Sequence, residues 1–126
     1  MHRNPLNPPE LPGPRGFSQS MRWGGLVILS VQLPLDGEGQ LVSEEFRPQC
    51  RHVFRNVEIA LEAQGVTLRD LLKITVYLTS LENYETFREV REEMLGSPFP
   101  TSTLIGVTGL AIPGALLSIE GLAAYN

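Results

Sequence analysis

The stretch LKITVYLT, residues 72–79, alternates apolar with polar side chains along its whole length. Because successive side chains of a β-strand point to opposite faces, this alternation predicts a strand with one apolar and one polar face. The apolar face needs a covering layer, so the strand indicates a sheet with helices on one side. The expected apolar face carries Leu72, Ile74, Val76 and Leu78, and the expected polar face carries Lys73, Thr75, Tyr77 and Thr79.

The polar face of this strand predicts an oligomer. Lys73, Thr75 and Tyr77 are too polar for a dry core, yet their surroundings are too apolar for a fully wetted surface. We therefore expect chains whose sheets face each other. The alternative is a monomer with a half-polar sheet face.

Two helices are predicted, one on each side of this strand. From residue 47 to about 64, apolar residues recur at steps of three and four, and Gly65 is a natural stop. Pro48 is tolerated because it falls in the first turn. Thr67 to Asp70 resemble a capping box for one short turn. The second helix is expected at about 82–95, with its apolar stripe at Tyr84, Phe87, Val90 and Met94.

The remaining segments predict further strands at 17–22 and 25–31, a short edge strand at 40–42, and two strands at 101–107 and 116–124. The resulting order predicts an α+β fold with one sheet and both helices packed on one face. Five of the ten prolines lie in the first 14 residues. We therefore predict that residues 1–15 form an extended, solvated, proline-rich arm and that residues 16–126 form a single domain.

Composition narrows the classes of function. The 126 residues carry 14 acidic and 10 basic side chains, a net charge of −4, and the arginines are scattered, so nucleic acid is not an expected partner. The lone Cys50, expected to be a buried structural thiol, rules out a disulfide within the chain, and such cysteine usage favours a reducing, cytoplasmic compartment. His2 and His52 are two isolated histidines and do not suggest a metal site. No metal or cofactor is expected. No apolar run reaches about 18 residues, so we expect no membrane span.

Five segments are distributed along the chain: GFSQ at 16–19, SVQLPLD at 30–36, NVE at 56–58, KITVYLT at 73–79 and IEG at 119–121. Together they resemble one known family, called RidA, YjgF or L-PSP. The resemblance implies a chorismate-mutase-like fold and a homotrimer whose sheets form a central barrel, with small-molecule sites in the clefts between subunits. It also implies an activity, the hydrolysis of reactive enamines and imines to keto acids and ammonia.

The same resemblance shows where this chain departs from the family. Active members hold the substrate carboxylate with an arginine in the segment that opens the penultimate strand, and Thr101 fills that position here. A threonine hydroxyl cannot replace a permanently charged, bidentate fork, which puts the deaminase activity in doubt. Phe17 replaces a tyrosine and Val31 replaces a glycine. Glu120 keeps the family's acidic position, where it would act as a base or hold water; alternatively, it pairs with another group across the trimer interface.

Arg88 aligns with an asparagine that faces the family's cleft, and Arg91 lies three residues further along. We hypothesise that Arg88 supplies the missing anion-binding fork. The alternative places Arg88 in a solvated row with Glu85, Glu89 and Glu92.

Three functions follow from these residues. The first is a noncatalytic or altered-specificity family member that binds a small anionic or carbonyl metabolite. Its site would use Phe17, Ser30, Arg88, Thr101, Ser102 and Glu120. The second is a working imine deaminase with altered substrates, using Glu120 and backbone amides near Val31 and Thr103. The third, a ribonuclease or translation inhibitor, is disfavoured by the acidic balance.

Overall fold

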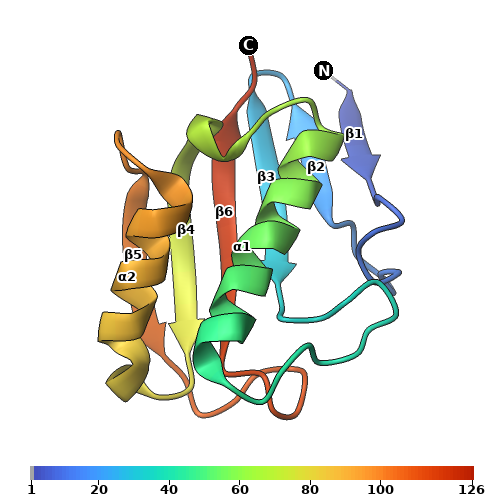
Figure 1. Cartoon of the computed structure of the whole chain (residues 1–126). Coiled ribbons are helices and arrows are strands. Elements are labelled where there is room, and N and C mark those ends of the chain that lie inside the picture. Colours follow the sequence, from blue (N-terminus) through green and yellow to red (C-terminus); the bar gives the residue numbers. More distant parts are fainter. Residues whose placement is uncertain (1) are drawn as a thin grey trace.

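The computed structural model describes residues 2–126 and contains one mixed sheet covered on one face by two helices (Figure 1). The strand order is β1-β2-β3-β6-β4-β5, and only β4 and β5 pair in parallel. The predicted arrangement of one sheet with both helices on one face is confirmed. In chain order the elements are β1 (Arg3–Leu6), β2 (Ser20–Trp23), β3 (Leu26–Gln32), α1 (Phe46–Ala63), η1 (Leu68–Asp70), β4 (Leu71–Leu78), η2 (Leu81–Asn83), α2 (Tyr84–Leu95), β5 (Thr101–Gly106) and β6 (Leu117–Ala124).

Local signals set the ends of α1 as expected. Pro48 lies in its first turn, where a missing N–H costs no helical hydrogen bond. The chain leaves the helix through Gly65, whose φ of 82° is a conformation that glycine adopts without strain. The capping box at Thr67 and Asp70 is present as well and starts the short turn η1.

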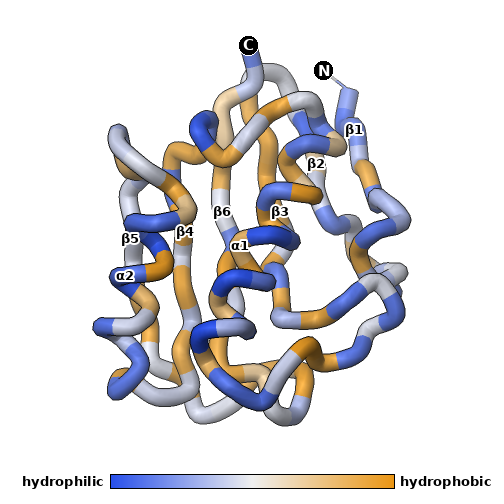
Figure 2. The backbone as a smooth tube through the Cα atoms, in the orientation of Figure 1, coloured by the Kyte–Doolittle hydropathy of each residue, from blue (hydrophilic) through white to orange (hydrophobic). Residues whose placement is uncertain are grey.

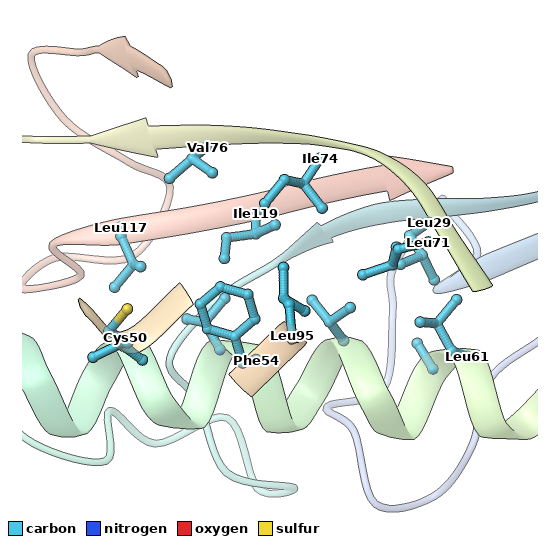
Figure 3. Close-up of a cluster of buried hydrophobic side chains, with 14 of the residues drawn as sticks. Leu29, Cys50, Phe54, Leu61, Leu71, Ile74, Val76, Leu95, Leu117 and Ile119 are labelled. Carbon is cyan, nitrogen blue, oxygen red and sulfur yellow. The ribbon is translucent and has the colours of Figure 1, made fainter. Parts of the chain in front are cut away.

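The hydrophobic core lies between the two helices and the sheet (Figure 3). The middle of it is an aromatic pair, Phe54 of α1 and Phe87 of α2, whose ring centroids are 6.0 Å apart. Along β3, β4 and β6 the buried side chains alternate with more exposed ones, and Figure 2 shows the long apolar stretches of these strands. The helix-facing side chains of the sheet include Val27, Leu29, Leu71, Ile74, Val76, Leu78, Leu117, Ile119 and Ala123.

The start of β4 differs from the predicted alternation. Leu72 was expected on the apolar face, but it is 52% exposed, and Leu71 is buried instead. The cause is a register shift between Leu71 and Lys73 where β4 pairs with β6, because an extra residue in one strand moves the following side chains to the other face.

The proline-rich N-terminal segment also differs from the prediction. Residues 3–6 are extended, but they form strand β1, which pairs with β2 and is not a solvated arm. Leu11 is 2% exposed and belongs to the core, and the Gln64 side chain donates a hydrogen bond to the Asn4 carbonyl. Proline is compatible both with an extended arm and with a strand at the edge of a sheet. The number of prolines therefore did not distinguish a solvated arm from an edge strand. Residue 1 lies outside the described residues.

Two smaller expectations are corrected. The strand expected at 17–22 begins only at Ser20, and the edge strand expected at 40–42 is a single bridge between Leu35 and Leu41. No helix within residues 2–126 combines the length and apolarity that crossing a bilayer requires.

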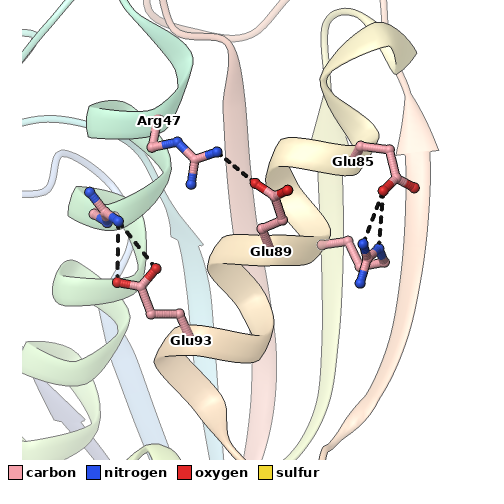
Figure 4. Close-up of polar contacts among 6 residues, drawn as sticks. Arg47, Glu85, Glu89 and Glu93 are labelled. Atoms are coloured by element: carbon pink, nitrogen blue, oxygen red, sulfur yellow. Dashed lines mark hydrogen bonds and ion pairs between the residues drawn. The ribbon is translucent and has the colours of Figure 1, made fainter.

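Two ion pairs join α2 to α1 on the outer surface (Figure 4). Arg47 contacts Glu89 at 2.6 Å, and Arg51 contacts Glu93 at 3.1 Å. The Arg47 guanidinium lowers the pKa of the Glu89 carboxyl, chiefly through this hydrogen bond. Because all four side chains are exposed, the pairs orient the helices more than they stabilise them.

Candidate functional site

The face of the sheet opposite the helices, called the open face below, collects most of the polar residues that the sequence singles out. Cross-strand partners point to the same side, so the register assigns its members. Thr101 pairs with Lys73, Thr103 pairs with Thr75, and Thr75 in turn pairs with Glu120. Apolar residues continue the open face toward β2, where Met21 pairs with Ile28 and Ile28 with Leu122.

Glu120 is held by a neighbour on the open face. The Tyr77 hydroxyl donates a hydrogen bond to Glu120 Oε1, and this bond is the main reason that the pKa of Tyr77 is raised. A cavity of about 210 Å³ beside them is lined by Lys73, Thr75, Glu120 and four neighbouring residues. Glu120 therefore accepts a hydrogen bond through Oε1, and its second oxygen has no hydrogen-bond partner among the described residues.

Thr101 offers no charge at the start of β5. Its hydroxyl donates to the Leu72 carbonyl at 3.1 Å, so even its single polar hydrogen is used within the chain. The only cation beside it in the strand register is Lys73. An ammonium group on a flexible stem cannot reproduce the planar fork of a guanidinium.

A second group of candidates lies at the end of β3. Phe17 and Val31 line a small cavity of about 70 Å³ together with Asn56. The Ser30 hydroxyl donates to the Ser18 carbonyl at 2.6 Å, which fixes the chain beside this cavity. Gln32, which is buried, donates to the Gln19 side chain at 2.8 Å. These contacts make the cavity wall rigid and polar on one side.

Arg88 does not approach β5. Its guanidinium contacts Glu85 at 3.0 Å (Figure 4). It also contacts Glu92 of the same helix at 3.0 Å. The hydrogen bond to Glu85 is the largest of the contacts that raise the pKa of Arg88. This arrangement matches the alternative of a solvated charged row.

Arg91, and not Arg88, forms a side-chain hydrogen bond with β5. Its Nη1 donates to Ser102 Oγ at 3.1 Å. Ser102 pairs with Ile74, a helix-facing residue, so it points away from the open face that Thr101 and Thr103 share. Sequence reasoning noted Arg91 only as a neighbour of Arg88. The spacing of the two arginines could have indicated the difference, because three residues along a helix turn the side chain of Arg91 by about 60° relative to that of Arg88.

Apart from Arg88, which is paired on its own helix, the candidates fall into three places within one chain. Among residues 2–126 no group of three or more His, Cys, Asp or Glu side chains could hold a metal ion. The three places are the end of β3 (Phe17, Ser30, Val31), the open face (Thr101, Thr103, Glu120) and the helix side of β5 (Ser102, with Arg91).

Cys50 is expected to be chemically inert in the folded chain. It is fully buried on α1, and burial raises the pKa of its thiol from 9.0 to about 12, although Arg47 and Arg51 lower it slightly. Since the thiolate is the reacting form, labelling at pH 8 should be about a thousandfold slower than for an exposed cysteine. A thiol-specific reagent followed by absorbance measures this rate. Adding urea should restore the ordinary rate, and rapid labelling without urea would contradict the expectation.

Comparison with known proteins adds a family context. Residues 10–125 match the family model described as endoribonuclease L-PSP. A RutC family protein of Pyrococcus horikoshii is 32% identical over 118 residues, covering 93% of this chain and 91% of that protein. A 2-iminobutanoate/2-iminopropanoate deaminase of Dermatophagoides farinae is 27% identical, covering 96% and 95%. The crystal structure of RidA from an Antarctic Psychrobacter superposes with a TM-score of 0.90 at 30% identity, covering 96% and 98%.

Proposed function

The chain belongs to the endoribonuclease L-PSP family, which includes RidA, and on this basis we propose that it binds a small carbonyl-bearing or anionic metabolite in clefts between the subunits of a homotrimer. We propose further that hydrolysis of 2-imino acids, the activity named for the Dermatophagoides relative, is weak or altered here. The observation that carries the second part is Thr101, an uncharged residue whose hydroxyl is already bonded to the Leu72 carbonyl.

The separation of the candidate groups supports shared clefts. Phe17 and Val31 lie at the end of β3, whereas Thr101 and Thr103 lie on β5, an edge strand separated from β3 by β6 and β4. Within one chain these groups therefore lie apart. A closed head-to-tail ring places one edge of each sheet against a different part of the next chain, so it can combine them.

The open face supports the trimer. It carries exposed apolar side chains from three strands, Trp23, Ile28 and Ile105, whose exposed fractions are 50%, 42% and 41%. Large exposed apolar surface of this kind is typical of a surface that binds another chain. The polar cluster of Tyr77, Glu120 and Lys73 would then lie inside the assembly.

Hydrolysis of a 2-imino acid needs a cation for the carboxylate and an acceptor that orients the attacking water. Glu120, with Tyr77 on one oxygen, can serve as that acceptor. What this open face lacks is a guanidinium at Thr101. This difference supports a protein that binds such compounds and hydrolyses them slowly.

A coupled assay tests this proposal. An amino-acid oxidase generates a panel of 2-imino acids, and semicarbazide traps those that survive. We expect the wild-type chain to leave the rate of semicarbazone formation nearly unchanged. Thr101→Arg should increase imine loss by at least about tenfold, part of the 10²–10³ that one preorganised donor can contribute.

Thr101→Gln is the matched control, since it adds length and hydrogen-bonding groups without charge. It should behave as the wild type. Rapid imine loss with the wild-type chain would overturn the proposal and establish a working deaminase with a different carboxylate anchor. No gain with Thr101→Arg would show that the open face lacks more than the arginine.

The arginines of the two α-helices give no support to a ribonuclease function. Four of the five arginines on the two α-helices are already paired with glutamates, so they present little free positive charge to a phosphate backbone. They are Arg47, Arg51, Arg55 and Arg88.

A further inference from the structure

Arg91 is the exception among the arginines of α1 and α2. Each of the other four lies within ion-pair distance of a glutamate, whereas no ion pair to Arg91 is present in residues 2–126. This is not for lack of carboxylates, because Glu92 is its neighbour in the chain and α2 holds four glutamates. The guanidinium of Arg91 instead points toward β5 and donates to Ser102 Oγ.

A cavity opens beside this guanidinium. It measures about 250 Å³ and is lined by Arg91, Glu92, Phe99, Pro100 and Ser102. Its wall combines a permanent cation, a hydroxyl and the ring of Phe99, which is 52% exposed. Glu92 is the acidic residue of the lining. Its carboxylate forms an ion pair with Arg88, which compensates its negative charge.

The position of Arg91 is fixed by packing. Its Cζ lies 5.3 Å from the ring centroid of Phe87, a fully buried residue of the core. Stacking on an aromatic face restrains the stem and leaves the outer N–H groups free to donate. A guanidinium that is held in place loses less entropy when it binds an anion, which favours a preformed site.

We propose that Arg91 and Ser102 bind the carboxylate of a small ligand whose apolar part lies against Phe99 and Pro100. The guanidinium fork takes both carboxylate oxygens, and the Ser102 hydroxyl, now accepting from Nη1, is close enough to turn its hydrogen toward the ligand. This inference rests on the proposed small-molecule function and names the residue that recognises the anion. The guanidinium is supplied from α2 on the helix side of β5, so it does not take the place of a side chain at Thr101, which lies on the open face.

Direct binding measurements test the assignment. Benzoate and 2-oxobutyrate serve as carboxylate probes, and benzamide serves as the neutral analogue of benzoate. Titration calorimetry of the full chain should show binding of both carboxylates and none of benzamide at the same concentration. Arg91→Gln should lower the affinity for benzoate at least about tenfold, because it removes the charge-assisted pair. Arg91→Lys, which keeps the charge and loses the fork, should fall between.

Arg55→Gln is the matched control. It removes one positive charge from an exposed arginine on the other helix, and benzoate affinity should stay within about twofold of wild type, as for a distant surface charge. Unchanged binding in Arg91→Gln would overturn the assignment. Loss of binding in Arg88→Gln with retention in Arg91→Gln would also overturn it, in favour of Arg88. If the wild-type chain binds neither carboxylate, the proposed small-carboxylate function fails as well.

Discussion

Replacing Ile28 with glutamate is expected to convert the proposed trimer into single chains. Ile28 lies in the middle of the apolar part of the open face, between its register partners Met21 and Leu122. A carboxylate at this point would be removed from water on assembly without a cation in the adjacent register positions. Light scattering coupled to size-exclusion chromatography measures the change as a threefold drop in mass.

The conservative variant Ile28→Val is the control, because it keeps the open face apolar and should remain a trimer. Ile28 is 42% exposed and points away from the helices, so Ile28→Glu should keep the circular dichroism spectrum of the folded chain. A wild-type mass of one chain would contradict the trimer itself. An unchanged mass in Ile28→Glu would show that the chains associate through another surface.

Replacing Phe54 with alanine should lower the free energy of unfolding by about 3–5 kcal/mol, the range for removing a fully buried aromatic side chain. Phe54 is fully buried on α1 (Figure 3). Its ring stacks on that of Phe87 of α2. Its loss leaves a cavity between both helices and the sheet, where little can collapse to fill it. Urea denaturation followed by circular dichroism gives the change.

Phe54→Leu is the graded control and should cost less, because it keeps most of the apolar contact. All variants must be compared at one protein concentration, since association of folded chains adds to their apparent stability. A loss below about 1 kcal/mol for Phe54→Ala would contradict the packing around this ring. The same variants, examined by light scattering, separate a weaker core from a weaker trimer.

The two proposals about ligand binding concern residues on different faces of the sheet. The open face, with Glu120 and Tyr77, would act on an attacking water, whereas Arg91 on the helix side of β5 would hold a carboxylate. Because Thr101 and Ser102 are consecutive residues of a strand, their side chains point to opposite faces. Thr101→Arg and Arg91→Gln therefore probe opposite sides of the same strand, and their effects can be measured independently.

Much of the candidate site was out of reach of sequence reasoning. The sequence suggests candidate residues but not how they are grouped in space: it predicts Ser102 beside Thr101 and Glu120, whereas its register partner Ile74 assigns Ser102 to the helix side. Arg88 was favoured over Arg91, yet both carboxylates that contact Arg88 lie one turn away on α2. The ion pairs of Arg88 and the contact of Arg91 with β5 depend on the arrangement of side chains in space. A local sequence pattern does not reveal such contacts.

The sequence alone determined the two α-helices and the strands β3, β4, β5 and β6, because the spacing of apolar residues and the effects of Pro48 and Gly65 are local. It also indicated a single sheet with helices on one face. Only the tertiary structure decided the rest. A register shift opposite β6 exposed Leu72 and buried Leu71, and pairing with β2 turned the proline-rich segment into β1. Which strands pair, and to which face of the sheet each side chain points, depends on partners distant in the sequence. These features are therefore decided by the whole fold.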